Sequence, residues 1–201
     1  MVDNILDGII DRCYDIQANI RLDNNGLIPN VLVITSTLDG EGKTTIAAAF
    51  SIALSRKGHS TVLVDTNIRK PAMYSIFNVA PSPGLAEFLQ NKADVENIKQ
   101  RINDKLTLIT AGSSQVNPVS LIDTSEMSNF IKMLKEQGNI VVIDSPSVTT
   151  GIESLVVSKM SEGVILVVNS RKTPCSKIRF AIKDLDNNEI NLLGVVLNNT
   201  I

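Results

Sequence analysis

The sequence predicts an α/β domain with a doubly wound, mostly parallel sheet, and two observations support this fold class. Short, continuous apolar runs rich in β-branched residues recur along the chain, as in strands buried on both faces of a parallel sheet. Segments with apolar residues at helical spacing lie between these runs, which is typical of strands joined by crossover helices. The runs span residues 31–34, 62–64, 106–109, 140–143, 164–168 and 192–197.

A helix is predicted before the first apolar run. Apolar residues recur there at helical spacing, namely Leu6, Ile9, Ile10, Cys13, Ile16 and Ile20. The sequence Asp-Asn-Asn-Gly at 23–26 favours a helix end, so this N-terminal helix is expected within residues 1–25.

The remaining residues, 30–201, are predicted to form the α/β core. Helical spacing over 46–54 and 127–134 supplies two of the helices that the alternation requires. The sequence contains no internal repeat and no linker, and 201 residues can bury one substantial core. Residues 1–201 are therefore expected to form a single domain.

Composition excludes several classes of protein. The 19 Lys and Arg against 21 Asp and Glu give a net charge of −2, which provides no general attraction to nucleic acid. The aromatic content of 3% without Trp offers few stacking platforms for single strands. Two cysteines are too few for a disulfide scaffold or a zinc cage. We expect a cytoplasmic protein without a secretory signal, a membrane span or a nucleic-acid partner.

A glycine-containing loop follows the first apolar run, with the sequence Thr-Ser-Thr-Leu-Asp-Gly-Glu-Gly-Lys-Thr-Thr over 35–45. This is the Walker A arrangement of P-loop NTPases, with Thr37 where a first glycine is usual. Glycine lets backbone N–H groups surround phosphate oxygens, Lys43 should reach the β- and γ-phosphates, and the Thr44 hydroxyl should ligate Mg²⁺. The predicted nucleotide-binding residues are Asp39, Gly40, Glu41, Gly42, Lys43, Thr44 and Thr45.

Two later strands are each followed by an aspartate, Asp65 after 62–64 and Asp144 after 140–143. The carboxyl ends of parallel strands meet at the edge where the Walker A loop also emerges. A carboxylate there can hold Mg²⁺ or accept a proton from an attacking hydroxyl. An aspartate at a strand end can instead cap the next turn, but beside a Walker A loop we favour metal binding or catalysis.

Together these motifs resemble the bacterial tyrosine kinases of capsule and exopolysaccharide biosynthesis. That family carries a second acidic motif, Walker A′, between Walker A and Walker B. Asp65 matches the first Asp of Walker A′ within Val-Asp-Thr-Asn-Ile-Arg-Lys-Pro at 64–71, and Asp144 matches the Walker B Asp within Ile-Asp-Ser-Pro at 143–146. The resemblance covers roughly residues 11–198.

The resemblance implies ATP-dependent phosphorylation of tyrosine on partner proteins. Lys43, Asp65 and Asp144 would be catalytic, with Asp65 as the base for the tyrosine hydroxyl. Thr44, Asp65 and Asp144 would hold Mg²⁺, and Asn198 would lie near the adenine. The resemblance further implies a membrane-spanning activator of the polysaccharide co-polymerase type, membrane association through that partner, and a homo-oligomer.

Some residues depart from the family pattern. Asn67 replaces the second Asp of Walker A′, which removes a charge near the metal site although an amide still hydrogen-bonds metal-bound water. Arg69 is a candidate for holding an acidic or phosphorylated partner. Tyr14 and Tyr74 are the chain's two tyrosines and the family's tyrosine-rich tail is lacking, so we expect transfer to other proteins.

Two alternatives to a kinase stay open on sequence grounds. One is a P-loop ATPase switch like the chromosome-partition and septum-placement ATPases, and the other is a degenerate ATP-binding regulator of polysaccharide assembly. Those switches usually carry an extra lysine early in the loop, where this chain has Leu38. Asn67 and the lack of a tyrosine-rich tail keep the degenerate regulator open as an alternative.

Overall fold

The computed structural model describes the backbone of residues 2–199 and the side chains of residues 6–199. The strands are β1 (Val31–Ser36), β2 (Thr61–Asp65), β3 (Lys99–Asn103), β4 (Leu106–Ile109), β5 (Ile140–Asp144), β6 (Gly163–Asn169) and β7 (Leu192–Asn198). The helices are α1 (Val2–Asp23), α2 (Lys43–Arg56), α3 (Met73–Phe77), α4 (Leu85–Leu89), α5 (Val95–Ile98), α6 (Pro118–Ile122), α7 (Ser125–Glu136), α8 (Glu153–Lys159) and α9 (Cys175–Asn187). All six predicted strands and the N-terminal helix are confirmed.

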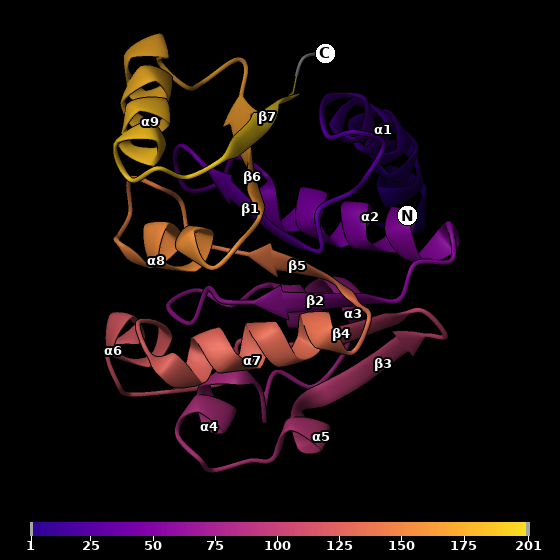
Figure 1. Cartoon of the computed structure of the whole chain (residues 1–201), viewed down its shortest axis with the longest axis vertical. Helices are drawn as coiled ribbons and strands as arrows, with labels where there is room; N and C mark the ends of the chain where they lie inside the picture. Colours follow the sequence, from indigo (N-terminus) through magenta and orange to yellow (C-terminus); the bar gives the residue numbers. More distant parts are fainter. Residues whose placement is uncertain (1, 200–201) are drawn as a thin grey trace.

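Within the described residues, one seven-stranded sheet has the order β3-β4-β2-β5-β1-β6-β7 (Figure 1). Neighbouring strands are parallel except for the antiparallel pair β3 and β4. The mostly parallel, doubly wound fold is therefore confirmed. Strands β1, β2, β5 and β6 are buried along their whole length, as their continuous apolar sequences predict.

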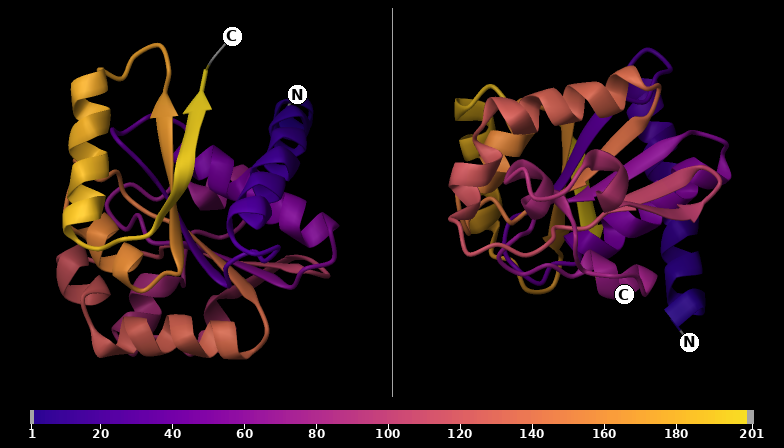
Figure 2. Two further views of the ribbon diagram at one scale, coloured as in Figure 1. Left: turned by 45° about the horizontal axis from the view of Figure 1, so that its top comes forward. Right: turned by 90° about the horizontal axis from the view of Figure 1, so that it is seen from below.

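Helices cover both faces of the sheet and create two hydrophobic clusters (Figure 2). On one face, α1, α2 and α3 pack over residues such as Leu32, Ile34 and Val142. On the other, α4 and α6 to α9 pack over residues such as Val33 and Ile143. Successive strand residues point to opposite faces, so each central strand serves both clusters. None of the helices in residues 2–199 is long and apolar enough to cross a membrane.

The two edges of the sheet differ from the sequence-based expectation. Strand β3, Lys-Gln-Arg-Ile-Asn, has no apolar run and was not predicted, because an exposed antiparallel edge strand needs no continuous burial. Strand β7 was expected to be buried on both faces, but it is the opposite edge of the sheet and most of its residues are partly or fully exposed. Val195 and Leu197 are 41% and 58% exposed.

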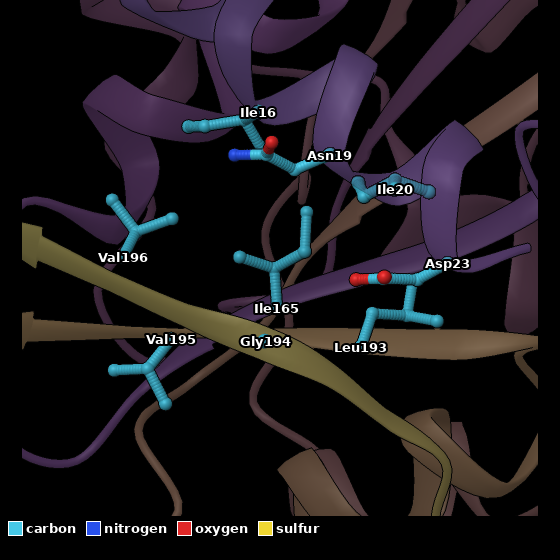
Figure 3. A pocket seen from close by; sticks show the side chains of 9 residues that line it. All are labelled: Ile16, Asn19, Ile20, Asp23, Ile165, Leu193, Gly194, Val195 and Val196. Carbon is cyan, nitrogen blue, oxygen red and sulfur yellow. The ribbon is translucent and has the colours of Figure 1, made fainter.

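A groove runs between α1 and the β7 edge (Figure 3). Its volume is about 290 Å³. Apolar side chains of Ile16 and Ile20 from α1, Ile165 from β6 and Val196 from β7 line it, with Asp23 near the end of α1. The groove lies beside β7, which pairs with β6 on one side and has no neighbouring strand on the other among the described residues, so apolar side chains and an open strand edge lie together.

Candidate nucleotide site

The phosphate-binding loop, residues 37–42, connects β1 to α2 at the carboxyl edge of the sheet. Gly40 and Gly42 have φ values of 80° and 92°, in the left-handed region that glycine adopts without strain. A Cβ at Gly42 would also lie 2.4 Å from Nδ2 of Asn198. The loop ends at the N-terminus of α2, where unpaired N–H groups and the helix dipole favour an anion.

Helix α2 fixes where the loop ends. Lys43 is its first residue and is buried, while Thr44 and Thr45 follow half-buried on the first turn. The run Ala47 to Ala49 is fully buried; alanine is a strong helix former and its small side chain allows a helix to lie close to a sheet. The sequence thus supplies both the helix and its close packing behind the loop.

The Glu41 side chain supports the loop instead of facing a ligand. Its buried carboxylate accepts hydrogen bonds from the N–H groups of Leu38 (2.7 Å) and Asn169 (3.1 Å) and from the Thr173 hydroxyl. The carbonyl of Glu41 accepts a hydrogen bond from Nδ2 of Asn198 (2.9 Å). Asn198, predicted near the adenine, therefore lies beside the loop, and Glu41 fastens the loop to the end of β6.

Asp65 and Asp144 lie side by side at the ends of β2 and β5. The two residues are register partners across the parallel pair, and both are almost completely buried. Lys43 is close enough for its positive charge to lower the pKa of both carboxyls. The structure therefore brings together the three residues that the sequence singled out as catalytic.

Burial nevertheless raises the pKa of both aspartates. For Asp65 the loss of solvation is the largest influence, and hydrogen bonds from the N–H groups of Asn67 (2.9 Å) and Met73 (3.3 Å) oppose it only in part. For Asp144 burial comes first and the negative charge of Asp65 adds to it, with Lys43 and the Thr44 hydroxyl acting in the opposite direction. Two buried carboxylates that face each other on neighbouring strands repel when both are ionised, so the pair favours a shared proton or a bound cation.

The donor set fits Mg²⁺. Both carboxylate oxygens of Asp144 are buried and have no hydrogen-bond partner among residues 6–199. Buried polar atoms are rarely left in that state, because the loss of hydration is costly unless a partner or an ion replaces it. The Thr44 hydroxyl lies near the same carboxyl group. Among the described residues, no three His, Cys, Asp or Glu side chains form a group that could hold a metal ion. Mg²⁺ usually keeps several waters and is bound through one or two carboxylates together with substrate phosphates.

A cavity of about 320 Å³ opens over the loop. It is lined by Asp39, Gly40, Gly42, Lys43, Thr44, Asn67, Lys70 and Ala72. The Walker A loop and the segment after Asp65 thus form two sides of one pocket. Asn67, predicted near the metal, and Lys43, predicted on the phosphates, both line it.

Asp39 is held by three partners from other segments. Its Oδ1 accepts hydrogen bonds from the hydroxyls of Ser147 (2.7 Å) and Thr150 (3.0 Å), and its Oδ2 lies 3.4 Å from Nζ of Lys70. The Ser147 hydrogen bond is the main cause that lowers the pKa of Asp39, and Thr150, Lys43 and Lys70 act in the same direction against a partial loss of solvation. Asp39 therefore joins the phosphate-binding loop to the segments that follow β2 and β5.

Arg69 is paired inside the chain. Its Nε and Nη2 lie 2.8 and 2.7 Å from Oε1 of Glu153, the almost fully buried first residue of α8. The predicted contact of Arg69 with an acidic or phosphorylated partner would have to share or break this ion pair. About half of the Arg69 side chain stays exposed.

Sequence reasoning missed four residues of the site: Lys70, Ser147, Thr150 and Glu153. Lys70 could have been found from its place in the basic pair just after the Walker A′ aspartate. The other three lie in the segment after β5, and no local pattern indicates that it turns back onto the phosphate-binding loop. The hydroxyl of Thr149 in the same segment donates to the carbonyl of Thr37 (2.7 Å).

Comparison with known proteins identifies the family of this chain. The model of the CobQ/CobB/MinD/ParA nucleotide binding domain matches residues 32–200. The tyrosine-protein kinase YwqD of Bacillus subtilis is 27% identical over 91% of this chain and 78% of its own length. The succinoglycan biosynthesis transport protein ExoP of Rhizobium meliloti is 31% identical over 85% of this chain but 22% of ExoP. The VpsO kinase domain superposes with a TM-score of 0.85 at 27% identity, covering 92% of this chain and 91% of that domain.

These relatives carry names from tyrosine phosphorylation and exopolysaccharide biosynthesis, in line with the resemblance found in the motifs. The family match spans the phosphate-binding loop, both acidic strand ends and β7. The chain belongs to the CobQ/CobB/MinD/ParA nucleotide-binding domain family, and its relatives include proteins named bacterial tyrosine-protein kinases.

Proposed function

We propose that the chain is a protein-tyrosine kinase of the capsule and exopolysaccharide type, which transfers the γ-phosphate of Mg-ATP to tyrosine on partner proteins. The observation that carries the proposal is the buried Asp65–Asp144 pair beside Lys43, at the edge where the phosphate-binding loop emerges. The named kinases among its relatives support the same activity over an ATPase switch.

Each residue has a distinct role in this proposal. Lys43 and the loop N–H groups bind the phosphates, and Thr44 with Asp144 holds Mg²⁺, which supplies charge neutralisation when bound. Asp65 accepts the proton of the tyrosine hydroxyl, and its raised pKa favours that task because a stronger base binds the proton more readily. Asn67 lines the same cavity with an uncharged amide, which would hydrogen-bond water around the ion. Asn198 contacts the base of the nucleotide.

Partners are part of the proposal. We infer that a membrane-spanning activator of the polysaccharide co-polymerase type brings the kinase to the cytoplasmic side of a membrane, and the relationship to the transport protein ExoP supports this. Assembly into a homo-oligomer and the use of tyrosine-containing proteins as substrates belong to the same proposal.

The test follows γ-labelled ATP with Mg²⁺ and an acidic copolymer that contains tyrosine. Label on tyrosine that is lost in Lys43→Met and Asp65→Ala, with ATP binding largely kept in Asp65→Ala, would support the proposal. Equal labelling by Lys43→Met would overturn it, and normal turnover in Asp65→Ala would remove Asp65 as the base. Release of free phosphate without tyrosine labelling, also after a candidate activator segment is added, would favour the ATPase switch. If tyrosine labelling and phosphate release are both absent under those conditions, the result would favour the degenerate regulator.

A further inference from the structure

We infer that Asp39 is a specificity-determining residue of the nucleotide pocket: its carboxylate lowers the affinity for a nucleoside triphosphate relative to the diphosphate. The inference rests on the proposed function in one respect, that the cavity over the phosphate-binding loop takes a nucleotide. It goes beyond that function because it assigns the Asp39 side chain a role opposite in sign to phosphate binding.

The first step is position. The Asp39 carboxylate belongs to the loop that surrounds the phosphates, and Asp39 lines the same cavity as Lys43 and Thr44. It is the only acidic residue among those that line this cavity within the described part of the chain. Glu41, the other acid of the loop, is 3% exposed and hydrogen-bonded away from the cavity lining.

The second step is that the carboxylate is fixed in place. Oδ1 accepts hydrogen bonds from Ser147 and Thr150, and Oδ2 faces Lys70. The two hydroxyls hold the group without neutralising its charge. The Lys70 contact at 3.4 Å is solvent-exposed, so it compensates the negative charge only in part. The pocket therefore keeps a negative charge on one side, opposite in sign to Lys43.

The third step is the charge of the ligand. A triphosphate carries about one negative charge more than the corresponding diphosphate, and a nearby fixed carboxylate opposes each added charge. The opposition is therefore larger for the triphosphate. Under partly screened conditions we expect a discrimination of about fivefold, which is the order of one charge pair at a few ångströms in a solvent-exposed pocket.

The competing explanation is purely structural, because Asp39 also fastens the loop to the segments after β2 and β5. The substitution Asp39→Asn separates the two. An asparagine has the same shape, and its Oδ1 can still accept from Ser147 and Thr150, so the fastening is largely kept while the charge is removed. Lys70→Met acts in the opposite direction, because it leaves the Asp39 charge uncompensated and removes a positive charge that lines the same cavity.

The experiment measures Kd by calorimetry for ADP and for an ATP analogue with a β–γ imido bridge, with the full chain at fixed Mg²⁺ and low salt. Asp94→Asn is the matched control: it removes the same charge from an exposed residue before α5 whose side chain makes no capping hydrogen bond. We expect the ratio of triphosphate Kd to diphosphate Kd to fall about fivefold in Asp39→Asn. The ratio should rise in Lys70→Met and stay unchanged in Asp94→Asn.

An unchanged ratio in Asp39→Asn, or an equal weakening of both nucleotides, would overturn the inference and leave the proposed kinase function intact. If the unsubstituted chain binds neither nucleotide, both fail together. Raising the salt concentration should shrink the difference between Asp39→Asn and the unsubstituted chain, since screening weakens exposed charge interactions.

Discussion

The pocket at the ends of β2 and β5 and the groove between α1 and β7 both open to solvent, yet they leave different groups without partners. Behind the residues that line the pocket, the unpartnered groups are polar and buried: Asp144 has two carboxylate oxygens without a hydrogen bond among the described residues. In the groove they are apolar and partly exposed, such as Leu193 and Val196 on the edge strand (Figure 3).

The two regions therefore differ in energetic character. Leaving a carboxylate buried without a partner opposes folding, whereas exposing a single apolar side chain has a small effect, because more than half of a typical protein surface is apolar anyway. A buried carboxylate that the fold keeps despite its energetic cost therefore indicates function more strongly than an exposed apolar side chain does. The pocket thus supports a functional proposal, and the groove marks an open sheet edge.

The largest effect is expected from a substitution at Gly42, whose backbone conformation shapes the phosphate-binding loop. Gly42→Ala places a side chain at φ 92° and 2.4 Å from Nδ2 of Asn198. We expect nucleotide affinity to fall by at least about tenfold, since a non-glycine residue in the left-handed region costs about 1–2 kcal/mol before any contact is displaced. Gly138→Ala is the matched control, with φ 81° and no atom within 4 Å of the added Cβ.

Calorimetry measures the ADP affinity of Gly42→Ala and Gly138→Ala, and urea unfolding measures their stability. Both substitutions should lower the free energy of unfolding, but Gly138→Ala should leave ADP affinity unchanged because it lies in the turn after α7. Equal ADP affinity in Gly42→Ala and the unsubstituted chain would show that the loop tolerates a side chain there, and the contrast between pocket and groove would weaken.

The second prediction concerns pH. The folded chain holds a proton on Asp144 more tightly than the unfolded chain, whose aspartates titrate near 3.8. The folded state therefore binds more protons, and the free energy of unfolding should decrease as pH rises from about 4 through the raised pKa of Asp144. Asp144→Asn should flatten this decrease, because it removes the carboxyl whose pKa burial and the charge of Asp65 raise to about 8.

Urea unfolding from about pH 4 to about pH 9, without Mg²⁺ or nucleotide, provides the measurement for Asp144, because this range extends past its raised pKa. Asp94→Asn removes an exposed carboxyl and should leave the pH profile as it is. If the pH profiles of Asp144→Asn and the unsubstituted chain are parallel, the pKa of Asp144 is not raised by folding, and the contrast between the pocket and the groove would lose its basis.

The third prediction adds a charge to the pocket. Asn67→Asp should lower the Mg²⁺ concentration needed for half-maximal transfer by about threefold, because a carboxylate attracts the ion more strongly than an amide does. Asn97→Asp adds the same charge on the exposed face of α5 and serves as the control. A Mg²⁺ titration that does not change in Asn67→Asp would mean that the amide lies outside the reach of the ion.

The smallest expected effect lies on the edge strand β7, beside the groove. Leu197→Ala on β7 should change the free energy of unfolding by no more than about 0.5 kcal/mol, because the side chain is already largely exposed. Leu166→Ala on the neighbouring β6 removes a fully buried side chain and should cost about 2–5 kcal/mol. Urea unfolding compares them directly. A loss above about 1.5 kcal/mol in Leu197→Ala would show that the edge strand contributes more packing than its exposure indicates.

Much of the pocket could be predicted from the sequence because its requirements are local. A loop that turns N–H groups toward a phosphate needs residues such as Gly40 and Gly42 at positive φ, and a helix N-terminus must follow at Lys43. Asp65 and Asp144 could be placed because parallel strands end at the same edge. The central strands were predictable because burial on both faces requires a continuous apolar run.

The tertiary structure alone decided which residues of distant segments meet. Ser147 and Asp39 are 108 positions apart, and Glu153 and Arg69 are 84 apart, so no local pattern links either pair. It also decided that β3 is a strand and that β7 is an exposed edge, since strand order within the sheet sets exposure. The physical reason is that local sequence selects each element, whereas contacts between loops depend on how the crossover helices bring the strand ends together.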